Sequence, residues 1–235
     1  MVLPKPSLVL LPFLLTLAGC TSFEASPAMQ MLHHVVSQGS GAERVQFDPR
    51  FHYLRVVVDS HVIFMASDTP NIDSANTTSV WYSAGREVLR FQNGRLVAAV
   101  GMDAEWRGVV LPELPAWAVL AHETEPLRWT RIRDVMPGYH FGTRDALVLR
   151  RIPAPENSKL KGLDPHSLIW FEERFDTENA VPASREVEAL PPARYALDEQ
   201  KDAQNSGGVV YGEQCLSAEL CFSWQRWPVR TEKPE

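Results

Sequence analysis

Several features are scarce or missing in this chain of 235 residues. It has three cysteines, no run of basic residues, and no apolar stretch after position 20 of the roughly 20 residues that a membrane-spanning helix needs. The Gly-x-Gly-x-x-Gly, Walker and Gly-x-Ser-x-Gly motifs are absent. With 23 basic and 29 acidic residues and a net charge of −6, the composition argues against a nucleic-acid partner, which favours a basic patch.

The first 19 residues have the pattern of a secretory signal peptide. Lys5 is their only charge, residues 8–17 are almost wholly apolar, and small residues follow at a cleavage site. The stretch Leu17-Ala18-Gly19-Cys20 resembles the lipobox of bacterial lipoproteins. That resemblance implies that the Cys20 thiol carries diacylglycerol and that Cys20 is the first mature residue. Thr21 follows it, and not the Asp that retains such lipoproteins in the inner membrane, so an outer-membrane anchor facing the periplasm is expected.

The alternative for residues 8–19 is a buried helix or a membrane span. The apolar run is shorter than a span requires, and Pro4, Pro6 and Pro12 disfavour a long helix. We therefore expect a signal peptide over residues 1–19 and a lipidated tether over 20–27. A single periplasmic β domain over 28–228 and a loose tail over 229–235 complete the predicted organisation.

Cys215 and Cys221 remain if Cys20 is lipidated. In an oxidising periplasm two cysteines six residues apart predict a disulfide across a tight hairpin, with two buried free thiols as the alternative. No further Cys or His lies close to this pair, so a metal site is not expected. We expect no other cofactor.

Strand patterns dominate the chain after a predicted helix over residues 28–37. Asn93-Gly94 between two apolar runs is a strong hairpin signal, because both turn residues need a positive φ. The pattern predicts an all-β fold, a long antiparallel meander curled into a half-barrel or open barrel, with one or two short helices. The expected strands are residues 53–58, 62–66, 80–83, 87–92, 95–100, 128–135, 146–152, 168–175, 185–190, 194–197, 209–216 and 220–227. Residues 109–121 are expected to form a strand followed by one or two helical turns.

The sequence offers little evidence for a catalytic site. His122-Glu123 begins like a zinc-protease helix, but Pro126 stands where the second histidine is needed. Glu172 and Glu173 are adjacent on a predicted strand and therefore point to opposite faces, which leaves Glu172 as an exposed pair with Arg174. We expect no catalytic residue and no enzymatic activity.

The histidines are also expected to have ordinary roles. His33 and His34 are adjacent on the predicted helix and face different sides. His52 and His61 lie on neighbouring predicted strands and are candidates to face one another, which by itself makes a weak site.

The chain has seven tryptophans, whose indole faces stack on sugar rings as well as in cores. Trp81, Trp129 and Trp170 are the candidates for glycan binding. Core packing is the alternative for each of them.

Several stretches taken together resemble the GfcB/YjbF family of outer-membrane lipoproteins, which are linked to group 4 capsule and exopolysaccharide production. The stretches are Tyr53-Leu54-Arg55-Val56, Val62-Ile63-Phe64, the region of Trp81, Phe91-Gln92-Asn93-Gly94-Arg95-Leu96, Leu127-Arg128-Trp129-Thr130-Arg131, Trp170-Phe171-Glu172-Glu173, and Tyr195-Ala196-Leu197-Asp198 through Gly207-Gly208-Val209. The Cys215/Cys221 hairpin and the polar insert 199–206 depart from the family pattern.

The resemblance implies a curled antiparallel sheet and an accessory, non-enzymatic role in capsule or exopolysaccharide biosynthesis and export. The implied partners are the outer membrane through the lipid anchor, surface polysaccharide and capsule-export proteins. The family supplies no catalytic residues to transfer.

Two rival functions follow from the same sequence. A carrier of lipid or lipid-linked glycan would need a continuous apolar pocket inside the curled sheet. A glycan hydrolase would need two carboxylates that converge on a groove. Asp103, Glu105 and Asp145 are the acids that remain as candidates.

Overall fold

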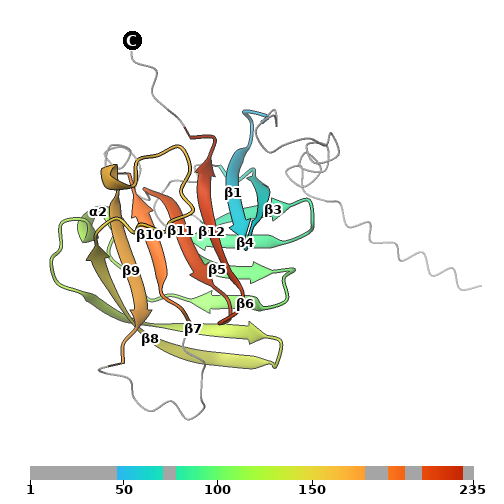
Figure 1. Ribbon diagram of the computed structural model, residues 1–235. Coiled ribbons are helices and arrows are strands. Elements are labelled where there is room, and N and C mark those ends of the chain that lie inside the picture. The colour runs from blue at the N-terminus through green and yellow to red at the C-terminus, as the bar shows by residue number, and fades with distance from the viewer. Residues whose placement is uncertain (1–46, 71–77, 178–189, 199–207, 230–235) are drawn as a thin grey trace, which may run out of the picture.

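The computed structural model describes residues 47–70, 78–177, 190–198 and 208–229, and these residues form twelve antiparallel strands and two short helices (Figure 1). The strands are β1 (His52–Val58), β2 (His61–Ser67), β3 (Thr78–Ser83), β4 (Val88–Gln92), β5 (Arg95–Val100), β6 (Glu105–Val110), β7 (Leu127–Met136), β8 (His140–Ile152), β9 (Ile169–Phe175), β10 (Ala193–Leu197), β11 (Val209–Cys215) and β12 (Cys221–Trp227). The helices are α2 (Trp117–Leu120) and the 3-10 helix η1 (Pro165–Ser167). Among the described residues, no helix is long and apolar enough to cross a membrane.

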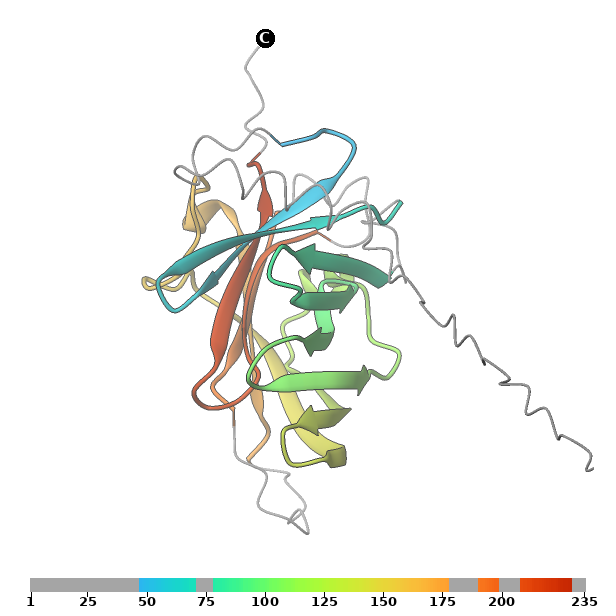
Figure 2. The same ribbon diagram turned by 90° about the vertical axis from the view of Figure 1, so that its right-hand side faces the viewer.

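Each strand pairs with the next one along the chain, and β12 pairs with β1, so that the sheet closes into a barrel. The closing pair runs in register from Tyr53 opposite Trp227 to Val58 opposite Phe222. Figures 1 and 2 show β9–β12 running steeply across β4–β7, so the barrel is flattened into two faces. Apolar side chains of both faces form one buried cluster.

This closure corrects the expected half-barrel or open barrel, while the all-β class and the antiparallel meander are confirmed. An open sheet would leave one row of unpaired N–H and C=O groups on β1 and another on β12. Closure pairs both rows with each other. The two edge strands are far apart in sequence, so local patterns carry no information about their pairing.

The hairpin predicted at Asn93-Gly94 joins β4 and β5. Asn93 has φ 50° and Gly94 has φ 72°, the left-handed conformations that a tight turn of this kind requires. The turn predicted between residues 58 and 62 is likewise present, with Asp59 at φ 53°.

Two strands extend further than their apolar patterns predict. β6 begins at Glu105 and not at Val109, and β8 begins at His140 and not at Ala146. The first half of β8 is largely exposed, and its pairing with β7 keeps it extended. Its residues therefore do not alternate between core and solvent, and the pattern fails there. The helical turns predicted within 109–121 are confirmed as α2, whereas the helix at 28–37, the tether and residues 185–189 of a predicted strand lie outside the described residues.

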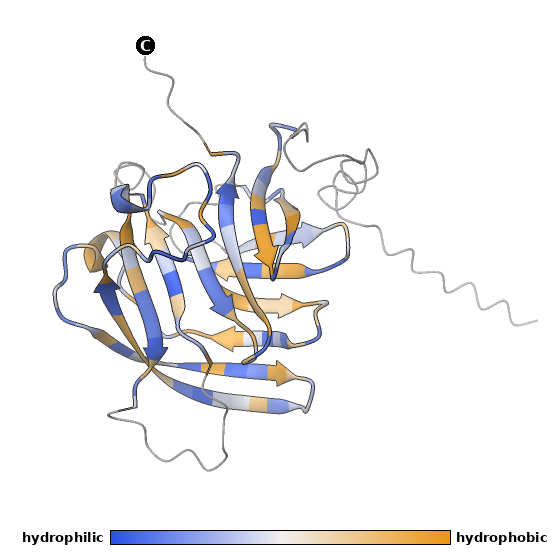
Figure 3. Cartoon of the chain, viewed as in Figure 1, coloured by the Kyte–Doolittle hydropathy of each residue, from blue (hydrophilic) through white to orange (hydrophobic). Residues whose placement is uncertain are grey.

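The barrel interior holds aromatic side chains from strands on both faces. Alternation of apolar and polar residues along the strands is visible in Figure 3. The largest fully buried side chains include three tryptophans and one tyrosine of the interior: Trp81, Trp106, Trp117 and Tyr195. On β11, a Cβ at Gly212 would lie 2.2 Å from Cζ2 of Trp224 on β12, so only glycine lets this ring lie flat against the sheet.

A long connection, residues 153–168, covers the outer face of β9–β12. The Lys159 amide donates to the Tyr211 hydroxyl at 2.7 Å, and the Lys161 amide donates to Gln225 Oε1 at 2.9 Å. Leu160 packs against a second apolar cluster that includes Trp170. The outside of the barrel is therefore covered here, and an edge of this cover borders the cleft described below.

Candidate functional site

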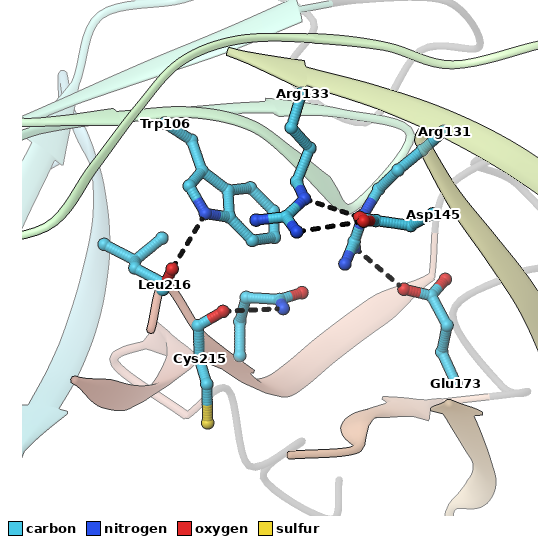
Figure 4. A network of polar contacts seen from close by, with 8 residues as sticks. Trp106, Arg131, Arg133, Asp145, Glu173, Cys215 and Leu216 are labelled. Carbon is cyan, nitrogen blue, oxygen red and sulfur yellow. Dashed lines mark hydrogen bonds and ion pairs between the residues drawn. The ribbon is translucent and has the colours of Figure 1, made fainter. Parts of the chain in front are cut away.

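A cluster of buried charges lies inside the barrel, and Figure 4 shows it from close by. Arg131 and Arg133 are two positions apart on β7, so both point to the interior face. Asp145 on β8 accepts from Arg131 Nε at 2.6 Å, from Arg133 Nε at 2.5 Å and from Arg133 Nη2 at 2.9 Å. Arg131 also donates to Glu173 on β9 at 3.2 Å.

Aromatic rings complete this cluster. The guanidinium groups of Arg131 and Arg133 lie over the Trp106 ring, with their Cζ atoms 4.6 Å and 4.7 Å from the ring centroid. The Trp106 indole N–H donates to the Leu216 carbonyl at 3.1 Å. These contacts fix the ring, so the guanidiniums gain a cation–π surface as well as their ion pairs.

A third buried guanidinium, that of Arg95, lies 3.9 Å above the Trp117 ring. Its Nε and Nη2 have no hydrogen-bond partner among the described residues. Burial lowers the pKa of Arg95, against the raising influence of Tyr195 and Glu173. Burial also raises the pKa of Glu173, and the nearby positive charges of Arg131 and Arg95 oppose that rise.

This arrangement does not suit a glycosidase. Asp145 and Glu173 converge on one guanidinium, but both carboxylates are buried and neither lines the cleft described below. A general acid or nucleophile must touch the substrate, and an ion-paired carboxylate inside a closed barrel does not. The described residues also hold no group of three or more His, Cys, Asp or Glu that would bind a metal ion.

The other acidic candidates are placed on the surface. Glu105 is bonded to Arg107 and to the Gly101 amide, and Asp103 is exposed. Glu172 points outward and Glu173 inward, as predicted. The prediction that Glu172 pairs with Arg174 is wrong. Glu172 accepts a hydrogen bond at 2.8 Å from Arg150, which lies directly opposite it on β8.

The histidine pair predicted on neighbouring strands is not a pair. His52 lies opposite Ser67 and His61 lies opposite Val58, so the two imidazoles are at opposite ends of the β1–β2 hairpin. His33 and His34 lie outside the described residues.

The three tryptophans predicted as candidates for glycan binding are all buried in this structure. Trp81 donates to Ser79 Oγ at 2.9 Å inside the barrel, and Trp129 is buried on β7. Trp170 is buried on the outside of the barrel and donates to the Pro165 carbonyl at 2.8 Å. Core packing, the alternative for each, accounts for their positions.

A cleft of about 820 Å³ lies on the outside of the barrel, beside the edge of the connection that follows β8. Three segments form it: residues 121–124 after α2, residues 150–154 at the end of β8, and residues 166–170 from η1 into β9. Trp170 belongs to its lining, together with the apolar side chains of Ile152 and Leu168.

Basic and hydrogen-bond-donating side chains predominate in the lining of this cleft. Arg150, Arg151, His122 and His166 line it together with one carboxylate, Glu123, and the Arg150 guanidinium is also paired with Glu172. Arg151 donates one N–H to the Ala121 carbonyl at 3.2 Å, which ties the end of β8 to the segment after α2. Guanidinium groups bind carboxylates and hydroxyls through several N–H donors at once. The donors of this cleft are therefore of the kind that suits a polar or anionic ligand.

Sequence reasoning found only parts of this cleft. The sequence indicates His122-Glu123 only as an incomplete zinc motif and Trp170 as a candidate for stacking on a sugar ring. It carries no such signal at Arg150, Arg151 or His166. The cleft residues come from three segments that are distant in sequence, so only the fold of β8 against β9 brings them together.

The predicted disulfide is confirmed. Cys215 and Cys221 are opposite each other at the end of the β11–β12 hairpin and are bonded, with an S–S distance of 2.06 Å. Cys20, the predicted lipid-attachment residue, lies outside the described residues.

No protein-family model matches the chain, and no curated protein matches it either. Among solved structures it is similar to a crystal structure described as that of a hypothetical lipoprotein of Escherichia coli K12, named YmcC. The similarity has a TM-score of 0.57 at 15% identity, and it covers 88% of this chain and 98% of that one. At this identity the likeness shows a shared fold and nothing further.

Proposed function

We propose that the chain is a lipoprotein anchored in the outer membrane through Cys20, facing the periplasm, that assists capsule or exopolysaccharide production without catalysing a reaction. The lipobox-like Leu17-Ala18-Gly19-Cys20 supports the anchor, and the disulfide suits an oxidising compartment. The fold shared with a protein described as a hypothetical lipoprotein agrees with this proposal.

The cleft outside the barrel carries the proposal that the ligand is a glycan. It is open to solvent and is lined by apolar side chains together with two arginines and two histidines. A sugar chain presents hydroxyl groups on its edges and C–H groups on its faces, and an acidic sugar adds a carboxylate. Arginine recognises such planar, oxygen-rich groups through paired hydrogen bonds.

The rival functions fit the geometry less well. A lipid carrier needs an apolar interior, whereas this interior contains the ion pairs of Arg131, Arg133, Asp145 and Glu173. A hydrolase needs two accessible carboxylates, and the two that converge are buried on Arg131. Contact with a capsule-export protein at the same cleft is the second binding mode that the charges permit.

A binding titration tests the glycan proposal. Every described strand lies after position 46, so a chain that begins at Thr21 keeps the whole barrel. We expect this chain to bind purified surface polysaccharide of the parent organism. The variants Arg151→Gln and His166→Ala should weaken binding at least tenfold, each removing a donor group from the cleft. Arg90→Gln, which changes an exposed arginine on β4 away from the cleft, is the matched control and should bind normally.

Two outcomes would overturn the glycan proposal. One is no binding by the parent chain, which would direct attention to export proteins. The other is binding that the cleft variants leave unchanged. Deletion of the gene separately tests the wider role, because unaltered surface polysaccharide would contradict an accessory function in its production.

A further inference from the structure

The turn between β7 and β8 exposes two aromatic side chains. Tyr139 is 72% exposed and Phe141 is 66% exposed, with ring centroids 6.4 Å apart. All seven tryptophans, by contrast, are buried or half-buried. The hairpin forms the lower right corner of the barrel in Figure 1, beyond the packed core. Two large apolar rings on a protruding turn do not contribute to packing of the described barrel.

The backbone holds these rings in place. Gly138, Tyr139 and Gly142 have φ values of 100°, 56° and 66°, so the turn adopts left-handed conformations at three positions. A tyrosine in this region is unfavourable unless its surroundings impose it. The Gly142 amide donates to Asp134 Oδ1 at 2.9 Å, which closes the base of the turn. The tip is therefore a defined projection that presents its rings to solvent.

The tip also lacks negative charge. From Val135 to Arg144 there is no Asp or Glu, although the whole chain carries a net charge of −6. His140 and Arg144 are the titratable or basic residues of this stretch besides Tyr139. Two carboxylates lie beside the base of the hairpin: Asp134 is bonded to the turn itself, and Glu105, opposite Met136 on β6, is paired with Arg107. A surface with this composition suits contact with anionic groups above an apolar layer.

We propose that the tip docks on the surface of a lipid bilayer, with the side chains of Tyr139 and Phe141 inserted among the headgroups. Tyrosine and other aromatic residues favour the membrane–water interface, since the ring lies in the apolar region and the hydroxyl stays hydrated. Arg144 is placed to meet lipid phosphate. A convex tip inserts among headgroups without a preformed groove, whereas a protein partner would need one of matching shape.

The tether allows this contact, and this step rests on the proposed lipid anchor at Cys20. Residues 21–46 separate Cys20 from Phe47; with the predicted helix over 28–37 at about 1.5 Å per residue and the others at roughly 3.5 Å, they span at most about 70 Å. The longest strand, β8, has 13 residues and is about 43 Å long at 3.3 Å per residue. The hairpin can therefore reach the bilayer that holds the anchor, which would orient the barrel on the membrane.

Vesicle flotation tests this proposal with the chain that begins at Thr21, which has no lipid anchor. Vesicles contain phosphatidylethanolamine and phosphatidylglycerol in one set and phosphatidylcholine alone in another, both at millimolar lipid. We expect the chain to float with the anionic vesicles and the double variant Tyr139→Ser/Phe141→Ser to partition at least tenfold more weakly. Arg144→Gln should reduce binding to the anionic vesicles and leave the weaker binding to phosphatidylcholine unchanged.

Val110→Ser is the matched control, because Val110 on β6 is 66% exposed, as Phe141 is, but lies outside the turn. It should bind as the parent chain does. All of these residues are exposed, so the variants should unfold at the parent temperature. Absence of vesicle binding, or binding that the double variant retains, would overturn the proposal. Polysaccharide binding at the cleft should be unaffected by the double variant, so failure here is distinguishable from failure of the proposed function.

Discussion

At the scale of single residues, Asp145 is the carboxylate on which the interior depends. It is fully buried and accepts hydrogen bonds from Arg131 and Arg133, while Arg131 also contacts Glu173. A buried ion pair costs more to break from one side than it contributes as a pair, since the remaining charge stays without compensation in a medium of low polarity.

We therefore predict that Asp145→Asn lowers the free energy of unfolding by about 3–5 kcal/mol, because two buried guanidiniums lose their shared negative charge. Urea denaturation of the chain beginning at Thr21 measures this change. Glu172→Gln is the control, since it breaks the solvent-facing pair with Arg150 and should cost no more than about 1 kcal/mol. Equal losses in the two variants would contradict a special role for the interior cluster.

Glu173 gives a pH prediction. Burial raises the pKa of its carboxyl above the usual value of 4.5, so the folded chain retains this proton to a higher pH than the unfolded chain does. Between the two pKa values the folded state binds more protons, and the contribution of Glu173 to stability falls as the pH rises. Glu173→Gln removes this titration.

The expected result is that the stability of Glu173→Gln relative to the parent chain increases as the pH rises above the usual carboxyl pKa of 4.5. Paired urea titrations at several pH values in this range give the difference directly. If that difference stays constant or decreases with pH, the raised pKa is wrong.

At the scale of elements, the short helix α2 buries the side chain of Trp117 in the core. The Trp117 indole N–H donates to the Asn93 carbonyl at 2.6 Å, and its ring lies 5.1 Å from Tyr195 and 5.5 Å from Phe171. The same ring supports the Arg95 guanidinium. So short a helix has little stability of its own, and the burial of Trp117 holds it in place.

Trp117→Ala should therefore lower the free energy of unfolding by about 3–5 kcal/mol, the usual cost of emptying a buried aromatic site. Val119 lies two residues along the same helix with an exposed side chain, and Val119→Ala should change stability by less than about 0.5 kcal/mol. Thermal or urea unfolding of both variants provides the comparison. Similar small effects would show that α2 is not held by its tryptophan.

Local sequence predicted most of these elements, because their signals are local. Asn93-Gly94 fixed one hairpin through the positive φ values of its two residues, and Cys215 with Cys221 predicted the link across another. The first half of β8 escaped prediction because its side chains are largely exposed. The inward direction of Glu173 followed from strand alternation, but its ion partner did not.

At the scale of the whole molecule, the proposed lipid anchor at Cys20 and the closed barrel occupy separate parts of the chain, since the first strand begins at His52. The barrel has its own packed interior and its own closure between β1 and β12. The anchor would only set where the barrel works.

We predict that Cys20→Ser abolishes incorporation of radiolabelled palmitate and removes the protein from the outer-membrane fraction. Acyl chains contribute about 0.8 kcal/mol per buried methylene, so the loss of two or three chains removes nearly all of the stable attachment. Thr21→Asp serves as the sorting control: it should keep the label and shift the protein toward the inner membrane. Label on the Cys20→Ser chain would contradict the lipobox assignment.

The sequence by itself determined the properties that depend on neighbouring residues. These are the lipobox-like stretch ending at Cys20, the alternating strands, the turn at Asn93-Gly94 and the cysteine pair of the last hairpin. Strand alternation and turn preferences act over a few residues, so they can be inferred without knowledge of the rest of the chain.

Only the tertiary structure decided the closure of the barrel, the burial of Trp81, Trp129 and Trp170, and the meeting of cleft residues from three segments. Each depends on contacts between residues far apart in the chain. A tryptophan has the same sequence signature whether it faces a sugar or the core, and an arginine the same whether it meets solvent or a buried carboxylate. Packing between distant strands selects one of these environments, and with it the surfaces that remain for binding.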